Sequence, residues 1–303
     1  MNQTTLRHAI RFADIGLHTG KTVTCTLRPA PENTGIVINI SNETGSTTLI
    51  PTPESVVSRG LATTLGQDGV TVSTVEHLLA TIRGLDIDNI YIDVDGVEIP
   101  ILDGSATGFV DKILAVGVKQ QKAPKRYLTV TAPYTYGEAE RYVTVEPHHT
   151  FTVECVIDFP HPVIGRQEKK ITVTPESFLQ VARARTFCML KDVEMMHKHG
   201  RALGGGLQNA IVLDKTVLNE GGLRYSDEFV RHKLLDFIGD MAVLPAPIKG
   251  KFTVHCSGHS VNNEFARGLM RSGKIAYQTA TSSRPATKER SKEQPMALAF
   301  MAG

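Results

Sequence analysis

The sequence lacks the features that mark several large classes of protein. It has no tryptophan, a formal net charge of only +2, and no apolar run near the roughly 20 residues needed to span a bilayer. So small a charge provides no electrostatic attraction for nucleic acid or an anionic membrane. The N-terminus has no apolar segment of the kind found in secretory signal peptides. We therefore expect a cytoplasmic protein that has no transmembrane segment and binds no nucleic acid.

Common catalytic and metal-binding motifs are also absent. The chain contains neither the H-E-x-x-H motif of zinc peptidases nor the G-x-S-x-G turn of serine hydrolases. Its four cysteines form no C-x-x-C pair, and their separations match no common zinc or redox motif. Because disulfides are rare in the cytosol, we expect Cys25, Cys155, Cys188 and Cys256 to be free thiols.

What is present is the composition of an ordinary globular protein, with 41% hydrophobic and 21% charged residues. Apolar periodicity places strands before helices in each half of the chain, which predicts an α+β fold. The first half is expected to hold strands at 21–27, 35–40 and 89–94 and helices at 74–84 and 108–115. The second half is expected to hold strands at 127–131, 141–145, 151–157 and 170–174, a helix that begins at Thr174-Pro175, and a helix at 227–243.

The polar stretch 120–126 separates the two halves and predicts a domain boundary there. We accordingly divide the chain into an N-terminal domain, 1–122, a C-terminal domain, 123–281, and a mobile polar tail, 282–303. Within the second domain, 188–222 combines methionine and leucine with a triple glycine, and it predicts an inserted helix, turn and strand. Methionine and leucine can form an adaptable binding surface, and ordinary local core is the alternative.

The strongest local signal for chemistry is a histidine and an aspartate one helical turn apart. His232 and Asp236 are four residues apart on the helix predicted at 227–243, so they share one face. An imidazole and a carboxylate in this arrangement can bind one metal ion. Solvated pairs that bind nothing have the same spacing, so the spacing alone leaves both interpretations open.

Two further stretches could carry chemistry. In Ser73-Thr-Val-Glu-His77, Ser73 and Glu76 fit a capping box, which would make Glu76 part of a helix start. Alternatively, a glutamate next to a metal-binding histidine can take a proton from a water molecule. His259 follows a strand-like segment at 252–255 and is expected on a turn, either exposed or acting as a general acid.

Taken together, many stretches of the chain resemble the LpxC family, the UDP-3-O-acyl-N-acetylglucosamine deacetylases of lipid A synthesis in Gram-negative bacteria. These stretches follow the family's order, cover most of the chain, and include several that are long and specific. They are GLHTG at 16–20, STVEHL at 73–78, GLDIDN at 84–89, PILDGS at 100–105, RARTF at 183–187, VLNE at 217–220, GLRY at 222–225, DEFVRHK at 227–233 and SGH at 257–259.

The resemblance implies hydrolysis of an acetamide with one Zn2+ per chain, and Fe2+ as an alternative metal. It also implies two similar domains, each a mainly antiparallel sheet with helices, with the helices sandwiched between the two sheets. The segment 188–222 would form the passage for the acyl chain. The implied roles are metal ligation by His77, His232 and Asp236, general base catalysis by Glu76, general acid catalysis by His259 with Asp240 as its partner, oxyanion binding by Thr186, and substrate binding by Lys233, Phe159, Phe187 and Asp192.

One position departs from the family pattern, because many relatives carry a phosphate-contacting lysine where this chain has Cys256. The expected substrate is UDP-3-O-acyl-N-acetylglucosamine, and the expected state is a monomer. Two alternatives remain open, a zinc amidase of other specificity and a non-catalytic protein that binds a nucleotide-sugar or a lipid. The complete set of predicted ligands, base and acid favours an enzyme, since a pure binder would not need it.

Overall fold

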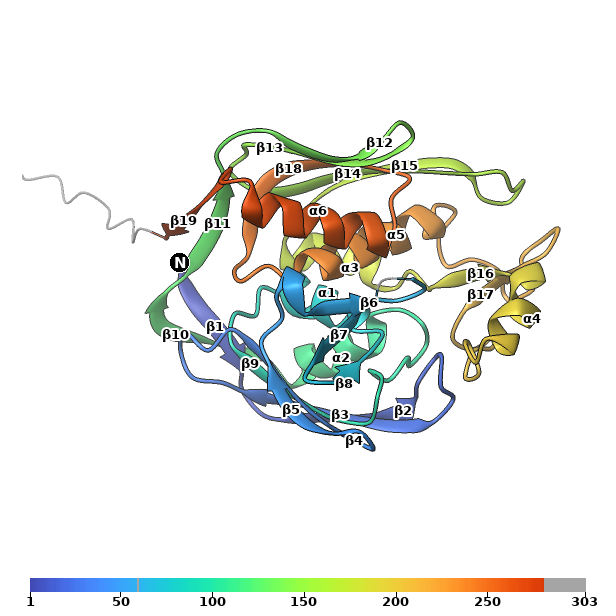
Figure 1. Ribbon diagram of the computed structural model, residues 1–303, viewed down its shortest axis with the longest axis horizontal. Coiled ribbons are helices and arrows are strands. Elements are labelled where there is room, and N and C mark those ends of the chain that lie inside the picture. Colours follow the sequence, from blue (N-terminus) through green and yellow to red (C-terminus); the bar gives the residue numbers. More distant parts are fainter. Residues whose placement is uncertain (59, 281–303) are drawn as a thin grey trace, which may run out of the picture.

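A computed structural model of the chain describes residues 1–58 and 60–280, so the predicted tail at 282–303 lies outside the described residues. Two large sheets enclose a layer of helices (Figure 1). The five-stranded sheet has the order β2 (Ile10–Ile15), β3 (Thr22–Pro29), β9 (Ile90–Asp95), β4 (Ile36–Asn42) and β5 (Gly45–Leu49). The seven-stranded sheet contains β11 (Arg126–Val130), β12 (Tyr134–Glu138), β13 (Arg141–Glu146), β14 (Phe151–Phe159), β15 (Gly165–Thr172), β18 (Ile248–His255) and β19 (Ile275–Thr279). Both sheets are mainly antiparallel, and each contains parallel pairings.

The helices divide into a central layer and one outlying helix (Figure 1). The central helices are α1 (Glu76–Gly84), α2 (Thr107–Val116), α3 (Pro175–Ala182), α5 (Glu228–Met241) and α6 (His259–Arg271). The outlying helix, α4 (Leu190–Lys198), lies beside the paired strands β16 (Phe187–Met189) and β17 (Ile211–Leu213). Among the described residues, no helix combines the length and hydropathy needed to cross a bilayer. The predicted α+β fold, with helices between mainly antiparallel sheets, is confirmed.

Local sequence explains much of this architecture. In β3, Val23, Cys25 and Leu27 are buried while the residues between them are more exposed, the alternation typical of a sheet with one covered face. At the start of α3, Thr174 accepts a hydrogen bond from the Ser177 main-chain nitrogen, and Pro175 occupies the first turn, as predicted.

The polar stretch 120–126 is mostly strand. β10 (Val118–Pro124) pairs with β1 (Asn2–Leu6), so two segments far apart in the sequence form a ribbon between the large sheets. The adjacent Lys125 is buried, and its ammonium group contacts Asp86 and Asp88. Because β10 crosses residue 122, the domain boundary there stays a prediction.

Close packing of α1 against α5 brings the two halves of the chain together. Gly239 of α5 permits this packing, because a Cβ atom at that position would overlap the main-chain carbonyl of Glu76. A short three-stranded sheet of β6 (Val56–Ser58), β7 (Thr64–Gln67) and β8 (Val70–Val72) precedes α1 and follows the 3-10 turn η1 (Pro53–Ser55). The first turn of α1 therefore lies directly against the middle of α5.

Candidate metal centre and active site

Three buried side chains converge where α1 meets α5. His77 lies in the first turn of α1, and His232 and Asp236 lie one turn apart on α5. The Asp236 Oδ1 atom is 3.3 Å from His232 Nε2 and 3.7 Å from His77 Nε2. One donor atom from each residue lies within 4.8 Å of the other two, a spacing that suits a single metal ion. The structure brings the three predicted ligands together, and their role as ligands stays a prediction.

The surroundings of these side chains fit a divalent cation. The His232 ring donates from Nδ1 to the Ala184 carbonyl, 3.0 Å away, which leaves Nε2 with a lone pair that faces Asp236. The Asp236 Oδ1 atom is buried and has no hydrogen-bond partner among the described residues. An unpartnered buried carboxylate oxygen is unfavourable, and a cation bound beside it removes that cost.

The protonation states at this point also favour metal binding. Burial lowers the pKa of His232 to about 4, so its imidazole is neutral at physiological pH. Burial acts to raise the pKa of Asp236, but His232 and Lys233 outweigh it and hold the pKa well below its ordinary value. A neutral imidazole and an ionised carboxylate are the forms that bind metal ions.

Of the two interpretations of Ser73 and Glu76, the capping box is wrong, although Glu76 does begin α1. The helix begins at Glu76, and its N-cap residue, Val75, makes no side-chain capping bond. The Ser73 hydroxyl instead lies 2.9 Å from the Thr64 hydroxyl. Thr74 has a φ of 57°, so the chain turns sharply between Ser73 and the helix. The Glu76 carboxylate is therefore not used for capping.

Glu76 instead faces the site. Its Oε2 atom accepts a hydrogen bond from the Thr63 main-chain nitrogen at 3.1 Å, and its Oε1 atom is 3.8 Å from His259 Nε2. Burial raises the pKa of Glu76, although His259 and His77 act in the opposite direction. A raised pKa suits a carboxylate that must accept and later release a proton.

His259 is buried in the first turn of α6, so the turn expected here is a helix start, and the alternative of an exposed histidine is wrong. Its Nδ1 atom donates to Asp240 Oδ2 at 2.9 Å. Burial alone would lower the pKa of His259, but Asp240 and Glu76 outweigh it and raise the pKa to about 10. The imidazole is therefore protonated near neutral pH, and its Nε2 proton points toward the side of the site occupied by Glu76.

Three residues that sequence patterns did not single out complete the surroundings of Asp240. Thr63 donates from Oγ1 to Asp240 Oδ1 at 2.6 Å, and Asn262 donates to Asp240 Oδ2 at 2.8 Å. Asn263 donates to Asp240 Oδ1 at 3.4 Å and to the His259 carbonyl at 2.8 Å. The asparagines lie three and four residues after His259, a helical spacing that could have revealed them, whereas Thr63 lies in a loop without any motif.

Three of the four predicted substrate-binding residues lie together. The ring centroids of Phe159 and Phe187 are 5.7 Å apart, and the Lys233 ammonium lies 5.5 Å from the Phe187 ring centroid. The same ammonium bonds Asp236 Oδ2 at 2.9 Å, which links this group to the predicted metal ligands. The fourth residue, Asp192, lies in the first turn of the outlying helix α4.

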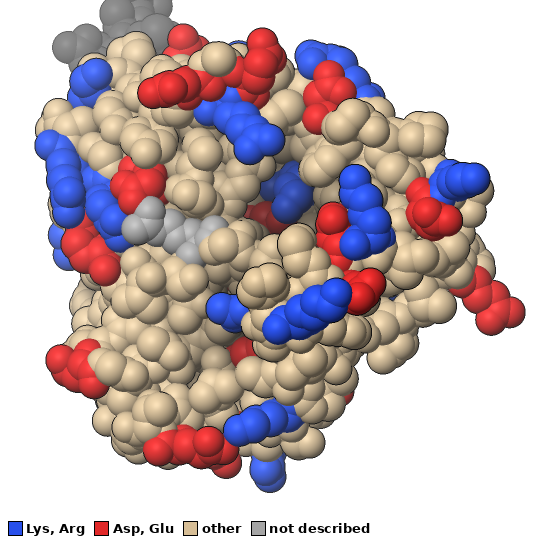
Figure 2. All heavy atoms as spheres, turned by 45° about the vertical axis from the view of Figure 1, so that its right-hand side comes forward, with Lys and Arg blue, Asp and Glu red and all other residues tan. Residues whose placement is uncertain are grey.

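An apolar cavity of about 360 Å³ adjoins Thr186 and Phe187. The segment 188–222, which has the predicted helix, glycine turn and strand, supplies most of its lining, including Leu190 and Met196. Figure 2 brings the side with α4 forward and shows a hollow near the middle of that face. Basic and acidic side chains lie recessed in the hollow and alternate around it.

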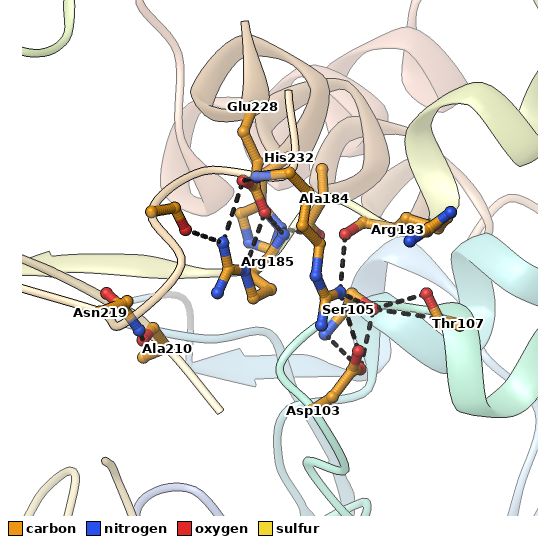
Figure 3. A network of polar contacts seen from close by, with 12 residues as sticks. Asp103, Ser105, Thr107, Arg183, Ala184, Arg185, Ala210, Asn219, Glu228 and His232 are labelled. Atoms are coloured by element: carbon orange, nitrogen blue, oxygen red, sulfur yellow. Dashed lines mark hydrogen bonds and ion pairs between the residues drawn. The ribbon is translucent and has the colours of Figure 1, made fainter. Parts of the chain in front are cut away.

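A polar network beside His232 joins the two halves of the chain (Figure 3). Arg224 donates from Nη1 to Asp103 Oδ2 at 2.8 Å and to the Arg183 carbonyl at 2.9 Å. The main-chain nitrogen of Thr186 donates to the carbonyl of Gly104 at 2.8 Å. Residues 183–186, which carry the predicted oxyanion hydroxyl of Thr186, are thus held against a loop of the first half.

Comparison with known proteins places this chain in a family. The model of the family LpxC, described as UDP-3-O-acyl N-acetylglycosamine deacetylase, matches residues 3–271. The chain is 52% identical over 295 residues to the UDP-3-O-acyl-N-acetylglucosamine deacetylase of Oleidesulfovibrio alaskensis, covering 97% of each chain. It is 50% identical over 280 residues to the protein of that name from Lawsonia intracellularis, covering 92% of each chain. It is 43% identical over 271 residues to that from Myxococcus xanthus, covering 89% of this chain and 86% of the relative.

Proposed function

Because this chain belongs to the LpxC family, we propose that it hydrolyses the acetamide of UDP-3-O-acyl-N-acetylglucosamine, releasing acetate and a free amine in lipid A biosynthesis. The observation that carries the proposal is the convergence of His77, His232 and Asp236 in one buried site with Glu76 and His259. A protein that only bound the nucleotide-sugar would not need an acid and a base beside three metal-binding side chains.

In the proposed reaction, His77, His232 and Asp236 hold one Zn2+, which when bound acidifies water and polarises a carbonyl group. Glu76 accepts a proton from the attacking water as the water oxygen adds to the acetamide carbon. The Thr186 hydroxyl donates a hydrogen bond to the carbonyl oxygen while negative charge develops there.

The C–N bond then breaks as the nitrogen takes a proton. His259 supplies this proton from Nε2. Asp240 accepts a hydrogen bond from the other ring nitrogen, Nδ1, and keeps the imidazole protonated. The amine leaves as a neutral group, which is why an acid is needed at this position.

The remaining predicted residues account for recognition of the substrate. The apolar cavity receives the acyl chain, and each methylene it buries contributes up to about 0.8 kcal/mol to binding. Around the entrance to this cavity, the nucleotide-sugar contacts Lys233, Phe159, Phe187 and Asp192. Cys256 replaces a phosphate contact that many relatives make with lysine, and we propose that the phosphates are held by the other residues.

We further propose that the enzyme works in the cytoplasm as a monomer, with Zn2+ or Fe2+ in the site. All four cysteines are free thiols in the structure, as expected, and this state is typical of a reducing compartment. A ligand set of two histidines and one aspartate accepts either metal.

The test compares wild type with Glu76→Ala, with bound metal and acetate release measured on the same samples. The variant is expected to retain its metal and to lose activity by about 10²–10⁴-fold. Glu43→Ala, at an exposed glutamate paired with Lys21, is the control and should behave as wild type. Full activity in metal-loaded Glu76→Ala would remove Glu76 as the base, and an active wild type without metal would overturn the proposal.

A substrate panel tests the specificity separately. Hydrolysis of UDP-3-O-acyl-N-acetylglucosamine should be far faster than that of UDP-N-acetylglucosamine without the acyl chain, free N-acetylglucosamine or an acetylated peptide. Equal rates on these compounds would contradict the proposed substrate while leaving the metal chemistry in place.

A further inference from the structure

A buried carboxylate at the start of α5 has no role in the reaction described above. Glu228 is fully buried and lies one turn before His232, on the same side of the helix. Its Oε1 atom accepts hydrogen bonds from the main-chain nitrogen of Arg185 at 3.0 Å and from Arg185 Nε at 2.9 Å. Its Oε2 atom accepts from Arg185 Nη2 at 3.2 Å and from the Arg224 main-chain nitrogen at 2.6 Å. All of these bonds converge on one side chain.

The partner of Glu228 lies between two residues of the site. Arg185 follows Ala184, whose carbonyl accepts the His232 Nδ1–H bond at 3.0 Å, and it precedes Thr186 (Figure 3). Arg185 is itself buried, and its Nη2 atom also donates to the Gly222 carbonyl at 2.9 Å. The bonds from both the main chain and the side chain of Arg185 fix the peptide unit next to Ala184.

These contacts form a closed ring of bonded groups. The ring runs from Glu228 through Arg185 to the Ala184 carbonyl, then to His232, and back along one turn of α5 to Glu228. Movement of Ala184 would change the direction of its carbonyl and release the His232 ring. The hydrogen bond to the second ring nitrogen is what orients a metal-binding histidine and fixes its tautomer.

A buried ion pair is weak evidence for stability by itself, since desolvation of the two charges offsets much of their attraction. Here the geometry is bidentate, which confers positional specificity, and the carboxylate lies at a helix N-terminus, where the dipole favours negative charge. The pair is therefore suited to holding the 184–186 segment in one place.

We propose that Glu228 is a positioning residue for the metal centre, which acts through Arg185 to hold the Ala184 carbonyl against His232. The inference rests on the proposed role of His232 as a metal ligand. Thr186 lies in the same held segment, with its main-chain nitrogen bonded to Gly104 and its carbonyl accepting from Ile211 at 2.7 Å. Glu228 thus positions one side of the centre without touching metal or substrate.

The experiment measures Zn2+ affinity of the metal-free full-length protein by competition with a chromophoric chelator. Glu228→Gln keeps the shape of the side chain, but its amide nitrogen cannot accept the hydrogen bonds made by one carboxylate oxygen. Its Kd for Zn2+ is expected to rise by about 10–100-fold. With Co2+ in place of Zn2+, the visible spectrum should change, and kcat should fall more than KM rises.

The matched control is Asp88→Asn, which removes another buried carboxylate, one bonded to Lys125 at 3.0 Å. Asp88→Asn should lower the melting temperature, but its Zn2+ affinity and Co2+ spectrum should match those of wild type. The same behaviour in Glu228→Gln would show that Glu228 is merely structural and would overturn the inference. If Glu228→Gln fails to fold, Arg185→Lys provides the test, because lysine keeps the buried positive charge but cannot make the bidentate hydrogen bonds of the guanidinium group. Wild-type Zn2+ affinity in Arg185→Lys would also overturn the inference.

His77→Ala separates this inference from the proposed function. If wild type binds Zn2+ no more tightly than His77→Ala, the proposed metal centre itself is wrong. If His77→Ala loses Zn2+ while Glu228→Gln retains it, only the role of Glu228 is wrong.

Discussion

Replacement of Asp240 by asparagine should move the pH range over which the enzyme works. Among the carboxylates that raise the pKa of His259 to about 10 against the opposing effect of burial, Asp240 has the largest effect. Without that charge the pKa of His259 falls, because burial is then opposed only by the smaller effects of Glu76 and Asp236. A general acid must be protonated, so activity is lost as the pH rises through its pKa. The alkaline limb of the pH profile should therefore move to lower pH.

The size of the effect follows from the protonated fraction of His259. Above the lowered pKa, each further pH unit reduces the protonated fraction about tenfold. The rate of Asp240→Asn relative to wild type should therefore fall by up to about tenfold per pH unit on the alkaline side, and the loss from this cause should disappear at acidic pH. The acidic limb, set by the raised pKa of Glu76, should move much less and also toward lower pH, because Asp240 has the smallest of the effects that act on Glu76.

The assay follows acetate release across pH for metal-loaded wild type and Asp240→Asn, with the melting temperature measured alongside. Asp88→Asn is the control, since it neutralises a buried carboxylate that has no contact with His259. An equal loss of rate for Asp240→Asn at every pH, with an unshifted profile, would refute the assignment of His259 as the acid.

Three further predictions concern the metal, the helix packing and the cavity. Asp236→Ala should lose bound metal, measured by elemental analysis, and with it nearly all activity; a metal-loaded variant would contradict its role as a ligand. Gly239→Ala should force α1 away from α5 and cost about 1–3 kcal/mol in the free energy of unfolding, measured by urea denaturation, with activity also reduced; wild-type stability would contradict the packing argument. Met196→Trp should fill part of the apolar cavity and reduce kcat/KM for long acyl chains more than for short ones; an equal effect on both would contradict its proposed use.

Helical spacing predicted one part of the site, whereas contacts between distant segments determined the rest. The helix expected at 227–243 is present at Glu228–Met241, and its pattern correctly placed His232 and Asp236 on one face. No local pattern connects His77 to them, because that contact depends on the close packing of α1 against Gly239. Family resemblance, and not residue spacing, predicted this connection.

The errors have a common physical cause, which is that a side chain can meet a partner from elsewhere in the fold. Ser73 fits a helix cap by spacing, but its hydroxyl pairs with Thr64 and the backbone at Thr74 turns away. His259 is expected on a turn because it follows the strand-like segment 252–255 and is flanked by glycine and small polar residues, yet these residues begin α6. Glu228 also continues the four-residue spacing of His232 and Asp236, yet only its contact with Arg185 suggests a role.

The two halves of the chain contribute unequal shares of the metal centre, and this has a consequence for folding. His77 comes from the first half and the other two ligands from the second, so a bound ion would close a long loop of the polypeptide. An ion that binds the folded chain but not the unfolded chain stabilises the folded state by about 2.7 kcal/mol when its concentration is about 100 times its Kd. Neither half, expressed as a separate fragment, has the full ligand set. Metal supply should therefore control whether complementary fragments reassociate, and in the intact chain it should couple the melting of one half to that of the other.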